Sequence, residues 1–341
     1  MKRERTDEIR AYILDHVEAR PGDIARRAAQ AYGITRQAVN RHLQALVDEA
    51  LLEAEGQTRA KTYRLRAVQH FEKRLHVTPV IQDARLWREY VEPLVAPLPE
   101  NVREVCRFAF TAAVENVIDH ARATRITVAG QVTASAIALT VADDGRGIFA
   151  QLVDALSLED PEHAIFELAK GGLTTDPERR SGASLFYAAR LMDQLRIHSA
   201  STALVVEDCG DRWRIERTEA PTAGTVIMMT ARRRSGVRAS EVLETFAAAK
   251  DTRALERAHV PVALLARSGE ALVSRAQAHR LLSRLERCNE AILDFRGVEA
   301  IGPAFADEIF RSFRAAHPRV NLVTLNASAG IRHLIRQALG A

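Results

Sequence analysis

Apolar and polar positions divide the chain into blocks of different periodicity. Residues 1–67 carry three short segments with apolar side chains at helical spacing, followed by two strand-like runs. Residues 68–99 form a connector that we expect to be helical. Residues 100–234 alternate long helices with strands, and residues 237–341 continue with a shorter alternation after a polar turn. The pattern predicts a multidomain α/β (α+β) protein.

The third helical segment of the N-terminal block, residues 36–46, separates an apolar face from a polar one. Val39, Leu43 and Leu46 recur at helical spacing and are expected to point into the core. Amide and guanidinium groups on the opposite face can hydrogen-bond base edges or phosphates, so we expect this helix to contact DNA. The residues of that face are Arg36, Gln37, Asn40, Arg41 and Gln44.

Two strand-like runs follow this helix at residues 51–55 and 62–65, and the segment between them carries Arg59 and Lys61. Both cations are expected to touch the phosphate backbone. The helices and the hairpin resemble a winged helix-turn-helix over nearly all of residues 5–66, which implies binding to double-stranded DNA. A winged-helix dimerisation module with a solvated polar face is the alternative. The basic, amide-rich third helix favours DNA.

In the second block, Asn116 and His120 share one face of a helical segment because they are four residues apart. An amide there can complete a Mg²⁺ shell and contact phosphate oxygens, and a base one turn later can add a phosphate contact. Alternating runs at residues 125–128 and 137–141 then predict a β-hairpin. The Asn–His spacing is common by itself, so it gains weight only from the segments that follow.

The hairpin ends in the sequence Asp143-Asp144-Gly145-Arg146-Gly147. We expect Asp143 to accept a hydrogen bond from the amino group of adenine. Gly145 and Gly147 are expected to let the backbone lie against the base. If this stretch stood alone, an acidic glycine-rich turn would be the simpler interpretation.

A long polar loop comes next, then a helix expected over residues 185–195, and later a strand that opens with a Gly-Thr step. Small residues at the start of a helix place backbone N–H groups against phosphate. We expect nucleotide contacts in these segments from Lys170, Gly171, Gly182, Ser184, Leu185 and Thr225.

The order of these segments over residues 100–232 resembles the GHKL family of gyrase-, chaperone-, histidine-kinase- and mismatch-repair-type ATP-binding domains. The resemblance implies a Bergerat-type α/β sandwich that binds ATP and Mg²⁺, with Asn116 as a magnesium ligand. Family members that hydrolyse ATP carry a glutamate four residues before this Asn, where the chain has Ala112. Glu115 directly precedes Asn116 and so lies about 100° from it around the helix, and we do not expect it to reach the place of that glutamate. Ser184 also stands where a glycine is usual, so we expect ATP binding with slow or absent hydrolysis.

The third block resembles the anti-sigma-factor-antagonist fold, specifically the STAS-like domain DUF4325, on residues 293–298 and 301–308. Phospho-regulated antagonists of this fold carry Ser or Thr where the chain has Gly, Pro and Ala at 302–304, so we expect a docking surface rather than a phosphorylation site. Asp294 and Asp307 are interpreted as capping or surface residues. Strands are expected at residues 262–265, 291–295 and 320–325, and helices at 274–288, 304–315 and from about 329.

Composition limits the function classes. Hydrophobic residues make up 47% of the chain and charged residues 27%, as in ordinary soluble proteins, and no apolar run is long enough for a membrane span. The net charge is +4, and residues 1–66 hold 13 basic against 10 acidic side chains, which favours a local polyanion partner. Cys106, Cys209 and Cys288 are far apart and indicate reduced thiols of a cytoplasmic protein.

Together, these motifs favour a cytoplasmic bacterial transcription regulator in which ATP occupancy of the central block controls DNA binding. The C-terminal block would relay the change or bind a protein partner, and a homodimer on two half-sites suits this helix-turn-helix type. The main alternative is an anti-sigma-type serine/threonine protein kinase that acts on a partner, against which Ala112 weighs. A scaffold with a structural nucleotide is the third hypothesis.

Overall fold

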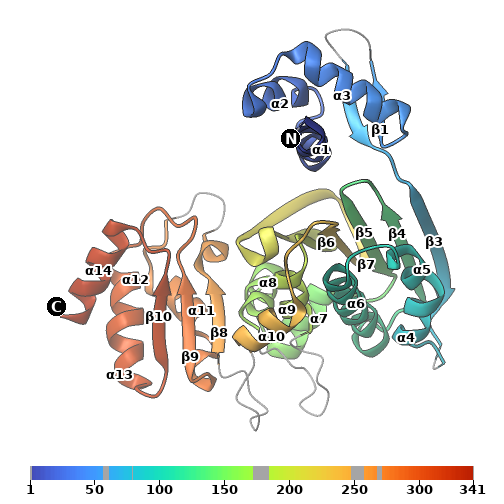
Figure 1. Cartoon of the computed structure of the whole chain (residues 1–341). Coiled ribbons are helices and arrows are strands. Elements are labelled where there is room, and N and C mark those ends of the chain that lie inside the picture. Colours follow the sequence, from blue (N-terminus) through green and yellow to red (C-terminus); the bar gives the residue numbers. More distant parts are fainter. Residues whose placement is uncertain are drawn as a thin grey trace.

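The computed structural model of the chain contains three hydrophobic cores (Figure 1). We call the parts around them the N-terminal unit (residues 2–65), the central domain (68–246) and the C-terminal domain (257–340). The structure describes residues 2–56, 61–78, 80–171, 184–246, 257–266 and 271–340.

The N-terminal unit consists of three helices and a two-stranded antiparallel hairpin packed around Ile13, Val39 and Leu43. Gly33 ends the second helix with φ of 62°, and Thr35 caps the third by accepting a hydrogen bond from the amide of Ala38 at 3.2 Å. The elements follow the predicted order. They are α1 (Lys2–His16), α2 (Ile24–Tyr32), α3 (Arg36–Asp48), β1 (Leu52–Glu55) and β2 (Thr62–Leu65).

The connector, predicted to be helical, begins instead as the strand β3 (Gln69–His76). It pairs antiparallel along its whole length with β4 (Arg125–Val132). Phe71 and Leu75 are partly buried against the central core, and their spacing of four residues suits a helix as well as one face of a strand. The remaining connector is helical, as predicted, in α4 (Asp83–Leu86), η2 (Trp87–Val91) and α5 (Glu92–Val95).

The passage from the N-terminal unit to the central sheet is short. Arg66 donates its backbone amide to the carbonyl of Leu51 at 3.0 Å, and Val68 donates its own to Val132 at 2.7 Å. The hairpin of the N-terminal unit therefore continues almost directly into β3 at the edge of the central sheet (Figure 1).

Five antiparallel strands form the central sheet in the order β3-β4-β5-β7-β6. Buried and half-buried positions alternate along β5, as expected of a strand with one face against the core. Helices cover that face and enclose the core around Phe110 and Leu139 (Figure 1). The further elements are α6 (Glu100–Glu115), η3 (Asn116–His120), β5 (Ala136–Asp143), α7 (Ile148–Leu156), α8 (Pro161–Lys170), α9 (Ser184–Leu191), β6 (Gln194–Glu207), η5 (Asp208–Gly210), β7 (Arg212–Arg232) and α10 (Ala239–Phe246).

Two predicted boundaries in this region are wrong. The helix expected over residues 185–195 ends at Leu191, and β6 begins at Gln194. The sequence pattern places residues from 237 onward in the C-terminal block, but α10 packs on the central core through Ala239 and Val242. The central domain therefore extends to residue 246.

The C-terminal domain has a parallel three-stranded sheet in the order β10-β9-β8. Residues 262–265, predicted as a strand, form the 3₁₀ turn η6 after the actual strand, because a short apolar run does not distinguish a strand from a buried turn. The helix predicted over residues 274–288 ends at Leu282, and a separate 3₁₀ turn, η7, follows after Arg284 takes a left-handed conformation. The remaining predicted strands and helices are present within a few residues of their expected bounds. The elements are β8 (Arg257–Pro261), η6 (Val262–Leu265), α11 (Arg275–Leu282), η7 (Leu285–Arg287), β9 (Glu290–Asp294), α12 (Pro303–Asp307), η8 (Glu308–Phe313), α13 (Arg314–Ala316), β10 (Asn321–Leu325) and α14 (Ala329–Leu339).

Candidate functional site

Asn116 lies where the long helix α6 widens into the π-helical turn η3. Its side chain is 6% exposed, and its amide nitrogen Nδ2 has no hydrogen-bond partner among the described residues. π-Helical turns are frequent at functional sites. A buried donor left without a partner destabilises a fold by about 1–3 kcal/mol, so Asn116 is a candidate ligand contact. His120, at the end of the same turn, is half-buried.

Asp143 and Asp144 are adjacent but have different roles. Asp144 accepts four hydrogen bonds of 2.7–3.0 Å, two from Arg125 and two from Thr124, and these hold its pKa well below the usual range. Asp143 is 7% exposed, and its Oδ1 accepts from the amide of Gly145 at 2.8 Å. Its Oδ2 has no partner within the described part of the chain. Asp144 therefore anchors the loop, and Asp143 presents an acceptor.

The electrostatic state of Asp143 indicates the kind of ligand it suits. Burial raises the pKa of this carboxyl above its ordinary value, against the lowering effect of the Gly145 amide, which donates to Oδ1, and of the nearby polar groups of Thr225. An N–H group placed at Oδ2 would stabilise the charged form. The carboxylate is thus arranged for a ligand group that donates a hydrogen bond, such as an amine.

Gly145 and Gly147 are needed for close approach of the chain to itself. A Cβ at Gly145 would lie 2.1 Å from the carbonyl oxygen of Ala121. Gly147 has a φ of 81°, and its Cβ would lie 2.3 Å from Oγ of Ser199. The space in which a side chain would stand is filled by this chain, so the fold itself requires glycine at both positions. That their backbone lies against a base stays a prediction.

Three segments that are distant in sequence meet at the end of α6. Ala121 donates its amide to the carbonyl of Asn116 at 3.1 Å and accepts from the amide of Arg146 at 3.0 Å, which ties the helix end to the loop after β5. Thr225 of β7 is 1% exposed, and its Oγ1 accepts from the amide of Ile148 at 3.0 Å. The predicted Asn, Asp-x-Gly-x-Gly and Gly-Thr segments are therefore brought together.

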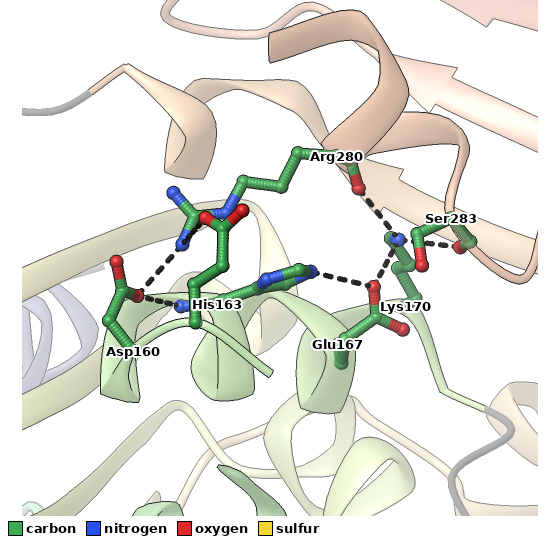
Figure 2. A network of polar contacts seen from close by, with 7 residues as sticks. Asp160, His163, Glu167, Lys170, Arg280 and Ser283 are labelled. Carbon is green, nitrogen blue, oxygen red and sulfur yellow. Dashed lines mark hydrogen bonds and ion pairs between the residues drawn. The ribbon is translucent and has the colours of Figure 1, made fainter. Parts of the chain in front are cut away.

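Lys170 does not join this group. The residue is 2% exposed, and its ammonium contacts the carboxylate of Glu167 and the backbone carbonyls of Arg280 and Ser283 in the C-terminal domain (Figure 2). All three protons of an ammonium are engaged by these acceptors. The predicted contact between Lys170 and phosphate is therefore replaced by an interdomain contact.

Several residues are expected to bind phosphate through their backbone N–H groups, and only some of them lie in the part of the chain that the structure describes. Gly171 has a φ of 76°, and a Cβ there would lie 2.7 Å from the ring of Phe186. Ser184 is half-buried in the first turn of α9, and the side chain of Leu185 is in the central core, so only its backbone could meet a ligand. Gly182 lies outside the described residues.

The position expected for a hydrolytic glutamate has no carboxylate. Ala112 is buried on α6. Glu115 is half-buried, and burial, followed by the charges of Asp83 and Asp119, raises its pKa. Asp83 also accepts a hydrogen bond from Oγ1 of Thr111 at 3.2 Å. Glu115 therefore stands among other acidic groups rather than in the place of Ala112.

The polar face of α3 is arranged as its periodicity predicts. Its inward residues Val39, Leu43 and Leu46 are buried. Lys61 is half-buried, with its ammonium 5.3 Å from the centre of the Tyr63 ring, and Arg59 lies outside the described residues. The exposed residues include Arg36, Gln37, Asn40, Arg41 and Gln44.

Sequence reasoning missed two groups of residues. Ser199 is buried, and its Oγ donates to the carbonyl of Gly224 at 2.9 Å. It packs against the loop of residues 143–147, which we call the Asp143 loop, but no motif identifies a serine within a strand. Glu167 and Lys170 are three residues apart on a helix, a spacing that favours an ion pair and could have been noticed. Their partner Arg280 could not, because it follows 110 residues later.

A magnesium ion would need ligands beyond the protein. Among the described residues no group of three or more His, Cys, Asp and Glu side chains could hold a metal ion. Asn116 supplies one oxygen. Mg²⁺ at phosphate sites commonly takes one or two protein ligands and completes its octahedron with phosphate oxygens and water. Asn116 fits that kind of site and not an all-protein cage.

Comparison with known proteins finds a similarity in the C-terminal part of the chain. No curated protein matches the chain. No helix in the described ranges is long and apolar enough to cross a membrane. Residues 277–331, from α11 into α14, match the family model of the STAS-like domain of unknown function, DUF4325. The C-terminal domain is therefore STAS-like.

Proposed function

We propose that the protein is an ATP-binding, DNA-binding transcription regulator, in which nucleotide occupancy of the central domain controls the N-terminal unit. The observation that carries the proposal is the pair of buried polar atoms, Nδ2 of Asn116 and Oδ2 of Asp143, without hydrogen-bond partners among the described residues. Buried polar groups in native proteins are nearly always satisfied. Two such atoms on segments that meet at Ala121 argue for a ligand that supplies their partners.

Adenine nucleotide has the matching chemistry. Its exocyclic amino group can donate to Oδ2 of Asp143, which lacks a donor. Asn116 can hold Mg²⁺ by its oxygen, and His120 can contact phosphate. The antiparallel sheet with helices on one face, and the order of the segments, support a GHKL-type domain with a Bergerat-type fold. Because Ala112 supplies no general base, the domain is proposed to bind ATP with slow or absent hydrolysis.

The N-terminal unit has the features of a winged helix-turn-helix. The exposed face of α3 combines Arg36 and Arg41 with amide side chains, the residue types that contact phosphates and base edges. A path from Asp143 to this unit runs through the sheet, since Asp143 ends β5, which pairs with β4, which pairs with β3. We propose a cytoplasmic protein that binds double-stranded DNA, as a homodimer on two half-sites.

Asp143→Asn is expected to weaken binding of a fluorescent ATP analogue by about 10- to 100-fold, because a hydrogen bond to a charged group contributes about 1.5–3 kcal/mol. Titration of the purified chain with the analogue and Mg²⁺ measures this. The matched control is Asp154→Asn, an exposed carboxylate of the same domain that pairs with Arg146. Equal affinities of the two variants would remove adenine recognition by Asp143.

Arg41→Ala is expected to weaken binding to duplex DNA about tenfold and to lower the salt dependence of binding by about one ion. Gel shifts with genomic fragments over a range of salt, with and without ATP, provide the measurement. Arg311→Ala, an exposed arginine on the C-terminal domain, is the control. If the chain binds no DNA either with or without ATP, the proposal that it is a transcription regulator is wrong. Transfer of labelled phosphate to a protein partner would establish the kinase instead.

A further inference from the structure

Helix α8 belongs to two cores at once. Ile165 and Leu168 pack in the central core. Phe166 and Ala169 pack in the core of the C-terminal domain. The C-terminal domain is therefore built onto a helix of the central domain, and α8 cannot shift without disturbing both cores.

The end of α8 is held by a buried ammonium. Nζ of Lys170 lies 2.5 Å from Oε1 of Glu167, 2.9 Å from the carbonyl oxygen of Ser283 and 3.3 Å from that of Arg280 (Figure 2). Two of these three acceptors belong to the C-terminal domain. His163 stands on the other side of Glu167, with Nε2 3.7 Å from the same oxygen.

The start of α8 is held by the same part of the C-terminal domain. Asp160 caps the helix by accepting from the amide of His163 at 2.7 Å, and the same oxygen accepts from Nη2 of Arg280 at 2.8 Å (Figure 2). Both ends of α8 therefore contact α11 or the residue that follows it. We call Asp160, Glu167, Lys170, Arg280 and Ser283 the α8 clamp.

Helix α9 is held through Arg190. This buried guanidinium donates to the carbonyls of Phe186 at 3.0 Å and Ala169 at 3.4 Å, and its Nη2 lies 3.3 Å from Nδ1 of His259 on β8. Burial, and then the charge of Arg190, lowers the pKa of His259 to about 4, so the imidazole is neutral and Nδ1 can accept. The guanidinium also lies over the ring of Trp213, 4.9 Å from its centre.

We propose that the C-terminal domain, by holding α8 and α9, couples its own docking to nucleotide binding. Helix α8 ends at Lys170, and helix α9 begins at Ser184. Each helix contacts the C-terminal domain through a buried cation, α8 through Lys170 and α9 through Arg190. Ser184 and Leu185 are predicted to contact nucleotide, so the coupling rests on the proposed function. Linkage makes the effect reciprocal: docking strengthens nucleotide binding, and nucleotide tightens docking.

The test is hydrogen exchange of the full chain, followed in peptides that cover residues 275–283. In the wild type, a non-hydrolysable ATP analogue with Mg²⁺ is expected to slow this exchange about tenfold. No predicted nucleotide contact lies in this segment, so the protection reports the coupling. Lys170→Met is expected to speed exchange without nucleotide and to weaken the analogue about tenfold.

Two further variants keep the test decisive. Glu167→Gln/Lys170→Met removes both charges of the buried pair, so it is expected to fold even if the single variant does not, and it still lacks the bonds from Lys170 to Arg280 and Ser283. It is expected to lose the nucleotide-dependent protection. Arg311→Met, which removes an exposed arginine paired with the half-buried Asp307, is expected to keep this protection.

The outcomes separate the two proposals. If the wild type fails to bind the analogue, the proposed function and the coupling fall together. If the analogue binds but leaves exchange at 275–283 unchanged, the coupling is overturned and the nucleotide site stands. The coupling is likewise overturned if the double variant binds the analogue as tightly as Arg311→Met and shows the same protection.

Discussion

Gly224→Ala is expected to destabilise the central domain strongly. Gly224 has a φ of 69°, a conformation that strains alanine, and a Cβ there would lie 2.1 Å from the carbonyl oxygen of Asp143. The two strands cannot separate to relieve the clash, because β5 and β7 are paired beside it, with Ala142 opposite Val226. Backbone strain and overpacking together are expected to cost about 3–5 kcal/mol. That is a large part of the usual stability of a domain.

Chemical denaturation followed by circular dichroism and by the fluorescence of Trp87, which lies in the central core, measures the loss. Gly236→Ala is the matched control, because a Cβ at Gly236 would have no atom within 4 Å among the described residues. It is expected to change the free energy of unfolding by less than about 0.5 kcal/mol. If the two alanine variants unfold alike, the Asp143 loop does not depend on the backbone approach at Gly224.

The elements that sequence predicts well are those whose pattern is decided locally. In α3 the inward residues recur at helical spacing, and in β4 and β5 buried residues alternate with more exposed ones. Neighbouring positions are therefore enough to distinguish a helix from a strand there. In β3 the two inward residues, Phe71 and Leu75, are four apart and fit either element. Only the pairing with β4, more than 50 residues later, makes this segment a strand.

The candidate site shows the same division. A motif selects Asp143 over Asp144, but the reason is visible only in three dimensions, where Thr124 and Arg125 satisfy Asp144 and leave Asp143 with an unpartnered oxygen among the described residues. Lys170 precedes two glycines, as a phosphate-binding lysine would. Its acceptors Arg280 and Ser283 belong to another domain, and no local sequence pattern predicts these contacts.

Lys170→Met is expected to lower the free energy of unfolding by about 3–5 kcal/mol, the usual effect of removing one partner from a buried ion pair. Glu167 is as deeply buried as Lys170, so the variant leaves a carboxylate without its main counter-charge. Burial raises the pKa of Glu167, but His163 and Lys170 outweigh it and bring the pKa below its ordinary value. Losing the lysine removes both its charge and its hydrogen bond to Glu167 and leaves only the contribution of His163.

Glu167→Gln/Lys170→Met separates the two sources of this loss. The double variant lacks both charges of this buried pair, so it is expected to regain part of the stability and to remain about 1–3 kcal/mol below the wild type, because the carbonyls of Arg280 and Ser283 lose their donor. Calorimetry at neutral pH measures the three forms. Arg311→Met serves as the exposed control, with an expected change of less than about 1 kcal/mol. A single variant no less stable than this control would mean that Lys170 and Glu167 do not stabilise each other in the folded chain, and that the hydrophobic contacts of Phe166 and Ala169 alone hold the C-terminal domain to α8.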